Sequence, residues 1–213
     1  MPRKRSFQFI PLAPARRRLG SEGSDVEFQS LMDWAESHVR QFSYITHPLP
    51  FALLLAANTG ARISEISSLR WDDWRPGFRE LTFRRSAWNR PGLKGRRIRG
   101  QTPFFRTVKV SAELAGHASY LEDAATSIWV FPGGKKHISA EYLSRILAEH
   151  CRREGYRITI HGIRRRWARA VYAQTGDLAL AQLAMGHHSI YVTKLYAEPS
   201  IPNVDITFPG TPK

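Results

Sequence analysis

The sequence HGIRRRWARAVYAQTGDLALAQLAMGHHSIYVTKLY, residues 161–196, decides the fold. It contains two helical patterns separated by Gly176-Asp177, where the glycine ends the first helix and the aspartate caps the second. Gly186 ends the second pattern. Three short elements therefore carry two imidazoles, one guanidinium and one phenol, which belong to His161, Arg164, His187 and Tyr196.

These four polar groups suit chemistry at a phosphodiester. His161 and Arg164 are three residues apart, so a helix places them on one face. Arginine binds phosphate oxygens bidentately, histidine transfers protons, and a tyrosine hydroxyl can attack phosphorus. Each residue also has an ordinary alternative, because the chain has eight histidines and Tyr196 alone would indicate packing. The register of all four together favours catalysis.

A second polar stretch, TGARISEISSLRW, occupies residues 59–71. Thr59-Gly60 is a turn signal, and the pattern predicts an amphipathic helix over Arg62–Leu69. Glu65 follows Arg62 by three residues, so its carboxylate is expected to hold the Arg62 guanidinium in place.

Three stretches of this sequence resemble the boxes of the tyrosine recombinase (phage integrase) family. TGARISEISSLRW resembles the first arginine box, HGIRRRWA resembles the His-x-x-Arg box, and MGHHSIYVTKLY resembles the Gly-His box that ends in the nucleophilic tyrosine. Their order and spacing match the family. The resemblance implies an α+β, mainly α-helical catalytic domain with a small antiparallel β-sheet or hairpin, which uses no metal and no other cofactor.

The resemblance also implies a role for each catalytic residue. Arg62 and Arg164 would clamp the non-bridging phosphate oxygens, and His187 would donate a further hydrogen bond. His161 would be the general base for the Tyr196 hydroxyl, whose attack gives a 3′-phosphotyrosyl intermediate.

A basic loop is expected between two strand-like segments, residues 80–85 and 104–111. Eight basic residues and no acid lie from Arg84 to Arg106. In the resembled family a hairpin here carries the lysine that protonates the leaving 5′-hydroxyl, and Lys94 matches it best; the alternative is a phosphate-binding flap with no catalytic member. The candidate DNA-binding residues are Arg84, Arg85, Arg96, Arg97, Arg99, Arg165 and Arg166.

Composition favours an anionic partner. The formal net charge is +14 and the pI is about 10.6, as expected for a protein that binds nucleic acid. The resemblance specifies double-stranded DNA and self-assembly into oligomers on it. The alternatives for the basic charge are an acidic membrane surface or a solvated basic face. No apolar run reaches the roughly 20 residues that span a bilayer, and we expect no membrane partner. Cys151 is the sole cysteine, which excludes an intrachain disulfide and favours the cytoplasm.

The chain divides into three predicted parts. Residues 1–24 form a basic flexible arm, which lies along DNA, is a solvated tail, or is a transit peptide. Residues 25–198 form the catalytic domain, and residues 199–213 form an extended tail. Because the stretch before Arg62 is short, we expect a catalytic domain alone, as in small DNA-inversion recombinases or a truncated integrase of a mobile genetic element.

Three functions are consistent with these features. The first is a site-specific recombinase or integrase that cleaves and rejoins DNA strands. The second is a non-catalytic DNA-binding relative, a regulator or accessory factor, that retains the integrase fold. The third is a relaxing topoisomerase that uses the same phosphotyrosine chemistry without choosing a sequence. The alignment of Tyr196 with two arginines and two histidines favours the first.

The remaining elements follow from hydrophobic periodicity. Helices are predicted at residues 25–40, 50–58, from Ser111, and at 138–155, with a short buried strand at 127–134. Cys151 is expected to be a core thiol. Trp71 and Trp74 are expected to pack against the helix before them rather than to stack on bases.

Overall fold

The structure, a computed structural model, describes residues 22–41, 43–84 and 105–185. The fold within these ranges is mainly helical with one small antiparallel sheet, which confirms the predicted class. The elements in order are α1 (Asp25–His38), α2 (Leu49–Thr59), α3 (Ile63–Ser67), the 3-10 helix η1 (Trp71–Asp73), β1 (Glu80–Arg84), β2 (Phe105–Lys109), α4 (Ala112–Glu122), α5 (Ala140–Glu154), α6 (Ile160–Thr175) and α7 (Leu178–Met185).

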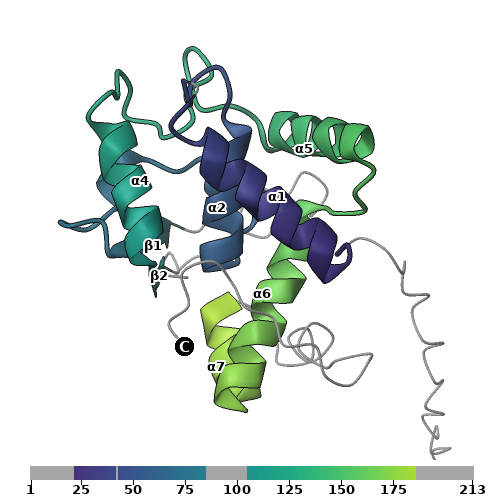
Figure 1. The fold of residues 1–213 in the computed structure, drawn as a ribbon. Helices are drawn as coiled ribbons and strands as arrows, with labels where there is room; N and C mark the ends of the chain where they lie inside the picture. The colour runs from purple at the N-terminus through teal and green to yellow at the C-terminus, as the bar shows by residue number, and fades with distance from the viewer. Residues whose placement is uncertain (1–21, 42, 85–104, 186–213) are drawn as a thin grey trace, which may run out of the picture.

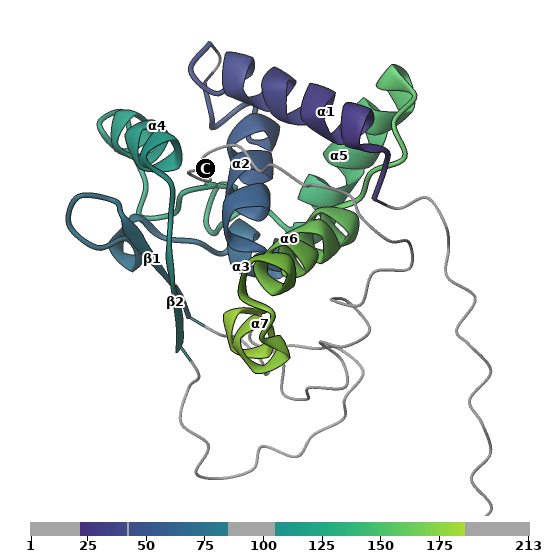
Figure 2. The same ribbon diagram turned by 60° about the horizontal axis from the view of Figure 1, so that its bottom comes forward.

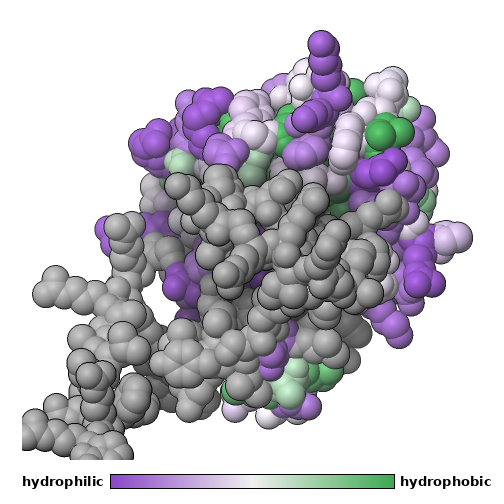
Figure 3. All heavy atoms as spheres, turned by 180° about the vertical axis from the view of Figure 1, so that it is seen from behind, coloured by the Kyte–Doolittle hydropathy of each residue, from purple (hydrophilic) through white to green (hydrophobic). Residues whose placement is uncertain are grey.

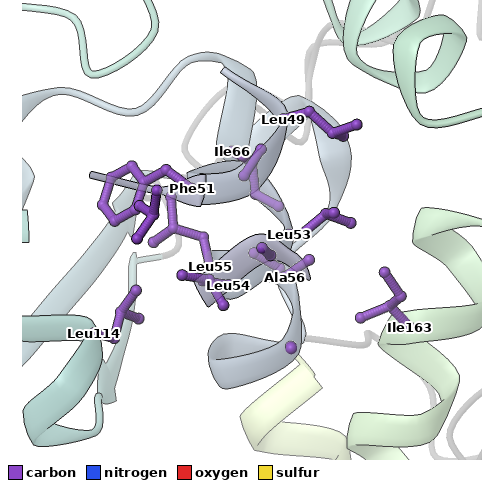
Figure 4. Packing of buried hydrophobic residues seen from close by; sticks show 14 of the residues in the cluster. Leu49, Phe51, Leu53, Leu54, Leu55, Ala56, Ile66, Leu114 and Ile163 are labelled. Carbon is purple, nitrogen blue, oxygen red and sulfur yellow. The ribbon is translucent and has the colours of Figure 1, made fainter. Parts of the chain in front are cut away.

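Helix α2 lies at the centre of the domain. Its sequence is apolar on every side, and such a helix is stable only when other elements cover it all round. α1, α4, α5 and α6 all contact it and surround it in both ribbon views (Figures 1 and 2). Leu114 of α4 approaches from one side and Ile163 of α6 from the other (Figure 4).

Side chains fix the beginnings of the helices where the sequence predicted them. Ser24 and Glu27 form a capping box at α1, with the Ser24 Oγ accepting from the Glu27 N–H at 3.1 Å. Ser111 caps α4 by accepting from the Leu114 N–H at 3.2 Å. The Asp177 carboxylate accepts from the N–H groups of residues 179 and 180, so its predicted N-cap role at α7 is confirmed.

Strands β1 and β2 pair in an antiparallel register that runs from Glu80↔Lys109 to Arg84↔Phe105. Thr82 and Thr107 face each other across the pair, with their hydroxyls 2.9 Å apart. Phe83 lies opposite Arg106, and both side chains are buried. The sheet therefore turns an arginine, as well as an aromatic ring, toward the protein interior.

Two sequence predictions about elements were wrong. Residues 127–134 are not a strand: they form only isolated bridges, from Trp129 to Arg70 and from Pro132 to His137. The segment that faces Trp129 enters the 3-10 helix η1 immediately, so the pairing cannot extend beyond one bridge. The helix predicted for Arg62–Leu69 is shorter, because Arg62 is its N-cap and the last helical residue is Ser67.

The predicted packing of the two tryptophans and of the lone cysteine is confirmed. Trp71, Trp74 and Cys151 are all buried in the core. On α5, Leu143 and Leu147 are buried, whereas Tyr142 is exposed. No helix in the described ranges is long and apolar enough to cross a membrane. Seen from behind, the described surface is mostly hydrophilic, with hydrophobic residues in small separate areas (Figure 3).

Candidate active site

The site is built around the carboxyl end of α2. A helix ends with backbone carbonyls that have no partner within the helix. Here three consecutive carbonyls each accept a hydrogen bond from a side chain elsewhere in the fold. The donors are Trp167 Nε1 to the Asn58 carbonyl at 2.9 Å, Arg106 Nη1 to the Thr59 carbonyl at 3.0 Å, and Arg164 Nη1 to the Gly60 carbonyl.

Gly60 permits this close approach. Its φ of +58° lies in the left-handed region that side chains disfavour. A Cβ at this position would lie 2.4 Å from Cε3 of the Trp167 ring. Glycine is therefore required at position 60 for two reasons: the left-handed backbone angle and the close contact between α2 and α6.

The same two arginines also hold the carboxyl end of α7. Arg106 Nη1 donates to the Ala184 carbonyl at 2.6 Å, and Arg164 Nη2 donates to the Met185 carbonyl at 2.6 Å. Cations are favourable at helix carboxyl ends, where the carbonyl dipoles concentrate negative potential. Each guanidinium thus joins the end of α2, which leads into Arg62, to the end of α7, which leads into His187.

Glu65 is the buried acid of the site. Its carboxylate accepts from the Arg62 N–H at 2.7 Å, from Arg62 Nη1 at 3.0 Å and from Arg106 Nη2 at 3.4 Å. Burial acts to raise its pKa, but the charge of Arg106, the Arg62 N–H, and the charges of Arg62 and Arg164 outweigh it, so the pKa is lowered. Glu65 is therefore ionised at neutral pH, and the predicted pairing with Arg62 is confirmed.

His161 stands at the beginning of α6, three residues before Arg164. Thr159 caps this helix by accepting from the Gly162 N–H at 3.0 Å. The imidazole keeps solvent contact, yet neighbouring protein atoms partly desolvate it and lower its pKa, and the charges of Arg165 and Arg164 act in the same direction. The ring is therefore neutral at pH 7, which is the state a proton acceptor requires.

The two arginines that follow Arg164 are paired within the protein. Arg166 is buried and bound to Asp25 and to the carbonyls of residues 22 and 23. Arg165 forms an ion pair with Glu22 at 3.1 Å, and Arg169 also binds Glu22. The burial of Arg166 gives it a structural role in place of the expected one in DNA binding. Residues 22 and 23 of the predicted arm are held against α6 by these contacts.

Several predicted site residues lie outside the described residues: Lys94, His187, Tyr196, Arg85, Arg96, Arg97 and Arg99. Arg84 belongs to β1, but its side chain is likewise outside the description. Among the predicted site residues that are described, Arg62, Glu65 and Arg164 come together, and His161 lies near Arg164 on α6. In the described part of the chain, no three or more His, Cys, Asp or Glu side chains form a metal-binding group.

Arg106 is a site residue that the sequence argument missed. It was counted among the basic residues of the loop, but its side chain is 6% exposed and reaches both helix ends. The signal was the alternation of β2, in which residue 106 lies opposite the buried Phe83 and shares its face.

Comparison with known proteins agrees with this geometry. The model of the phage integrase family matches residues 25–201. The chain belongs to this family. Similar proteins include a Sinorhizobium fredii protein named as an integrase/recombinase, y4rC, which is 30% identical over 158 residues, 70% of this chain and 44% of that protein. Tyrosine recombinase XerA of Pyrococcus furiosus is 28% identical over 148 residues, 68% of this chain and 48% of that protein.

Solved structures show the same integrase fold. The XerA recombinase aligns with a TM-score of 0.62 at 20% identity, over 83% of this chain and 60% of that chain. The Tn1549 transposon integrase, solved with transposon right-end DNA, aligns with a TM-score of 0.64 at 14% identity, over 87% of this chain and 64% of that chain. A lambda integrase dimer bound to a COC′ core site aligns with a TM-score of 0.58 at 18% identity, over 88% and 62% of the two chains. This chain spans about half the length of the two curated relatives.

Proposed function

We propose that this chain is the catalytic part of a site-specific DNA recombinase that cuts and rejoins strands through a 3′-phosphotyrosyl intermediate. The observation that carries the proposal is the pair of bonds from Arg164 to the Gly60 and Met185 carbonyls. These bonds bring the first arginine box, the His-x-x-Arg box and the start of the Gly-His box to one place. Membership of the phage integrase family supports the same reaction.

The proposed first step is attack on a DNA phosphate. His161, which is neutral at pH 7, accepts the Tyr196 proton while the phenolic oxygen bonds to phosphorus. Arg62 and Arg164 stabilise the negative charge that grows on the non-bridging oxygens, and His187 donates a further hydrogen bond. Glu65 keeps the Arg62 guanidinium oriented before DNA arrives. Positioned charges of this kind lose no energy to reorganisation during the reaction.

The proposed second step completes the exchange. The bond from phosphorus to the 5′-oxygen breaks, and Lys94 protonates that oxygen as it leaves. The 3′-phosphate remains esterified to Tyr196, so the energy of the broken bond is retained. A 5′-hydroxyl from a second DNA end then attacks the phosphotyrosine, which restores the phosphodiester and releases the phenol without ATP.

The proposal assigns DNA binding to the basic residues around the hairpin. The residues that would contact phosphates are Arg84, Arg85, Arg96, Arg97 and Arg99. Arg165 follows Arg164 on α6, and its guanidinium forms an ion pair with Glu22. Strand exchange needs several protomers on DNA. The lambda integrase relative was solved as a dimer on its core site, and this supports self-assembly of the present chain on double-stranded DNA.

A covalent trapping assay tests the proposal. Nicked duplexes are built from the DNA that flanks the protein's own coding region, so that the strand released by cleavage diffuses away and the adduct accumulates. Wild type, Tyr196→Phe and Tyr120→Phe are compared on denaturing gels. Tyr120 is the matched control because it is an exposed phenol on α4, away from the site.

The expected result is a protein–DNA adduct with wild type and Tyr120→Phe and none with Tyr196→Phe. An adduct that persists in Tyr196→Phe would contradict the assignment of the nucleophile. Salt-sensitive DNA binding without any adduct would replace the proposal with the non-catalytic DNA-binding relative.

A further inference from the structure

Arg106 lies on strand β2, but its side chain contacts the carboxyl ends of α2 and α7 and the buried carboxylate of Glu65. Its Nη1 binds the Thr59 and Ala184 carbonyls at 3.0 and 2.6 Å, and its Nη2 lies 3.4 Å from Glu65 Oε2. We infer that Arg106 is a positioning residue of the strand-transfer site: it sets the geometry of Arg62 and of the carboxyl end of α7. The inference rests on the proposed function and adds a residue to it.

The first route from Arg106 to the reaction passes through Glu65. Glu65 presents one oxygen to the Arg62 backbone and the other to the Arg62 side chain. Arg106 binds the same oxygen as the Arg62 N–H, and its charge favours the ionised carboxylate. Without Arg106, burial of Glu65 is opposed by fewer positive charges, and the carboxylate holds the Arg62 guanidinium less firmly.

The second route passes through the end of α7. The Ala184 carbonyl lies three residues before His187, and Arg106 ties it to the Thr59 carbonyl. Arg164 ties the next carbonyl, that of Met185, to Gly60. Two adjacent carbonyls are thus held by two different elements, β2 and α6. The last turn of α7 is therefore held from two sides.

An arginine is required here for geometric reasons. One planar guanidinium reaches two carbonyls and a carboxylate, and it also lies over the Phe83 ring, with Cζ 4.7 Å from the ring centroid. A lysine ammonium carries the same charge but has no planar fork and no stacking surface. Arg106→Lys therefore separates charge from orientation, and Arg106→Met removes both while keeping similar length.

The test measures cleavage and local opening together. Single-turnover cleavage of the nicked duplex is followed at saturating DNA, below the unfolding midpoint of every protein, for wild type, Arg106→Met, Arg106→Lys, Glu65→Gln and Arg106→Met/Glu65→Gln. His117→Leu is the matched destabilised control, because His117 is buried and paired with Glu36 at 2.6 Å between α4 and α1. Hydrogen–deuterium exchange compares residues 62–66 and 178–185 with the α1 and α4 peptides.

Positioning predicts that Arg106→Met cleaves at least about tenfold more slowly, since misplacement of about 1 Å near a reacting centre costs up to roughly 100-fold. DNA affinity stays within about twofold, Arg106→Lys cleaves at an intermediate rate, and the double variant is hardly slower than the slower single variant, because both residues act in one unit. Exchange rises in residues 62–66 and 178–185 alone, whereas His117→Leu raises it at α1 and α4 and cleaves at the wild-type rate.

Wild-type cleavage by Arg106→Met, or exchange that rises uniformly, would overturn the inference. If wild type forms no adduct at all, the proposed function fails, and hydrogen–deuterium exchange becomes the only test of Arg106. In that case a rise in exchange of Arg106→Met confined to residues 62–66 and 178–185 supports its positioning role, and no local rise refutes it.

Discussion

The substitution Glu65→Gln tests the buried charge network directly. It keeps the size of the side chain and an oxygen for the Arg62 N–H, but it removes the charge that faces two guanidinium groups. The Arg106 and Glu65 side chains are only 6% and 8% exposed, so their pairing is shielded from solvent, whereas Arg62 is 30% exposed. Removing one partner of a buried pair costs about 3 kcal/mol or more, and an exposed pair contributes less than about 1 kcal/mol. We expect the free energy of unfolding to fall by about 3 kcal/mol.

Urea denaturation at pH 7, followed by circular dichroism, measures this loss. Glu80→Gln is the matched control: Glu80 pairs with Arg75 at 3.3 Å, but the two side chains are 37% and 64% exposed, so the expected loss is below about 1 kcal/mol. Equal losses for the two variants, or a loss below about 1 kcal/mol for Glu65→Gln, would refute the reasoning.

The pH dependence gives a second check of the same variant. The native pKa of Glu65 is lowered, so its contribution to stability is fully present above the unfolded pKa of about 4.3 and is lost as the pH falls through the native pKa. The stability difference between wild type and Glu65→Gln should therefore stay constant from about pH 8 to 5 and shrink below about pH 4. A difference that grows on acidification would contradict the lowered pKa.

Four further outcomes are expected. Gly60→Ala should lower the free energy of unfolding by about 2 kcal/mol more than Gly77→Ala, because both have positive φ but only the Cβ at position 60 meets the Trp167 ring; equal losses would contradict this. Asp177→Ala should cost about 1 kcal/mol through loss of the α7 N-cap, and an unchanged urea midpoint would count against that cap. Burial raises the pKa of Cys151 to about 11, so at pH 8 a thiol reagent should label the native protein on the order of 100-fold more slowly than the unfolded chain; equal rates would show that the thiol is accessible. The His161 ring should titrate below its ordinary pKa of about 6.5 in a nuclear magnetic resonance experiment, and a midpoint above that value would argue against a neutral base.

The parts of the fold that the sequence predicted correctly depend on local signals. Ser111 and Asp177 begin helices because their side chains satisfy nearby N–H groups, and this needs no knowledge of the tertiary structure. The apolar run of α2 predicted a buried helix because a helix that is apolar all round is stable only when other elements cover it. The segment at residues 127–134 failed because strand pairing depends on what its partner does, and its partner enters a 3-10 helix.

The parts of the site that the sequence predicted depend on spacing within one element. Arg62 with Glu65, and His161 with Arg164, are three residues apart, so a helix turn brings each pair together. Arg106 was missed because its partners are distant in sequence, at residues 59, 65 and 184. Arg166 was misassigned for the converse reason: a run of arginines predicts a solvated basic face, and only the tertiary structure shows that Asp25 and residues 22–23 bury one of them.

The central claim is that Tyr196 becomes joined to the 3′ end of a cleaved DNA strand. Two readouts of the trapped complex measure this directly. Denaturing gels compare strands labelled at the 5′ or the 3′ end, and mass spectrometry after nuclease and protease digestion locates the linked nucleotide. The account predicts that only the 5′-labelled strand remains with the protein and that the nucleotide mass lies on the peptide containing Tyr196. Retention of the 3′-labelled strand, or a nucleotide on any other residue, would contradict it.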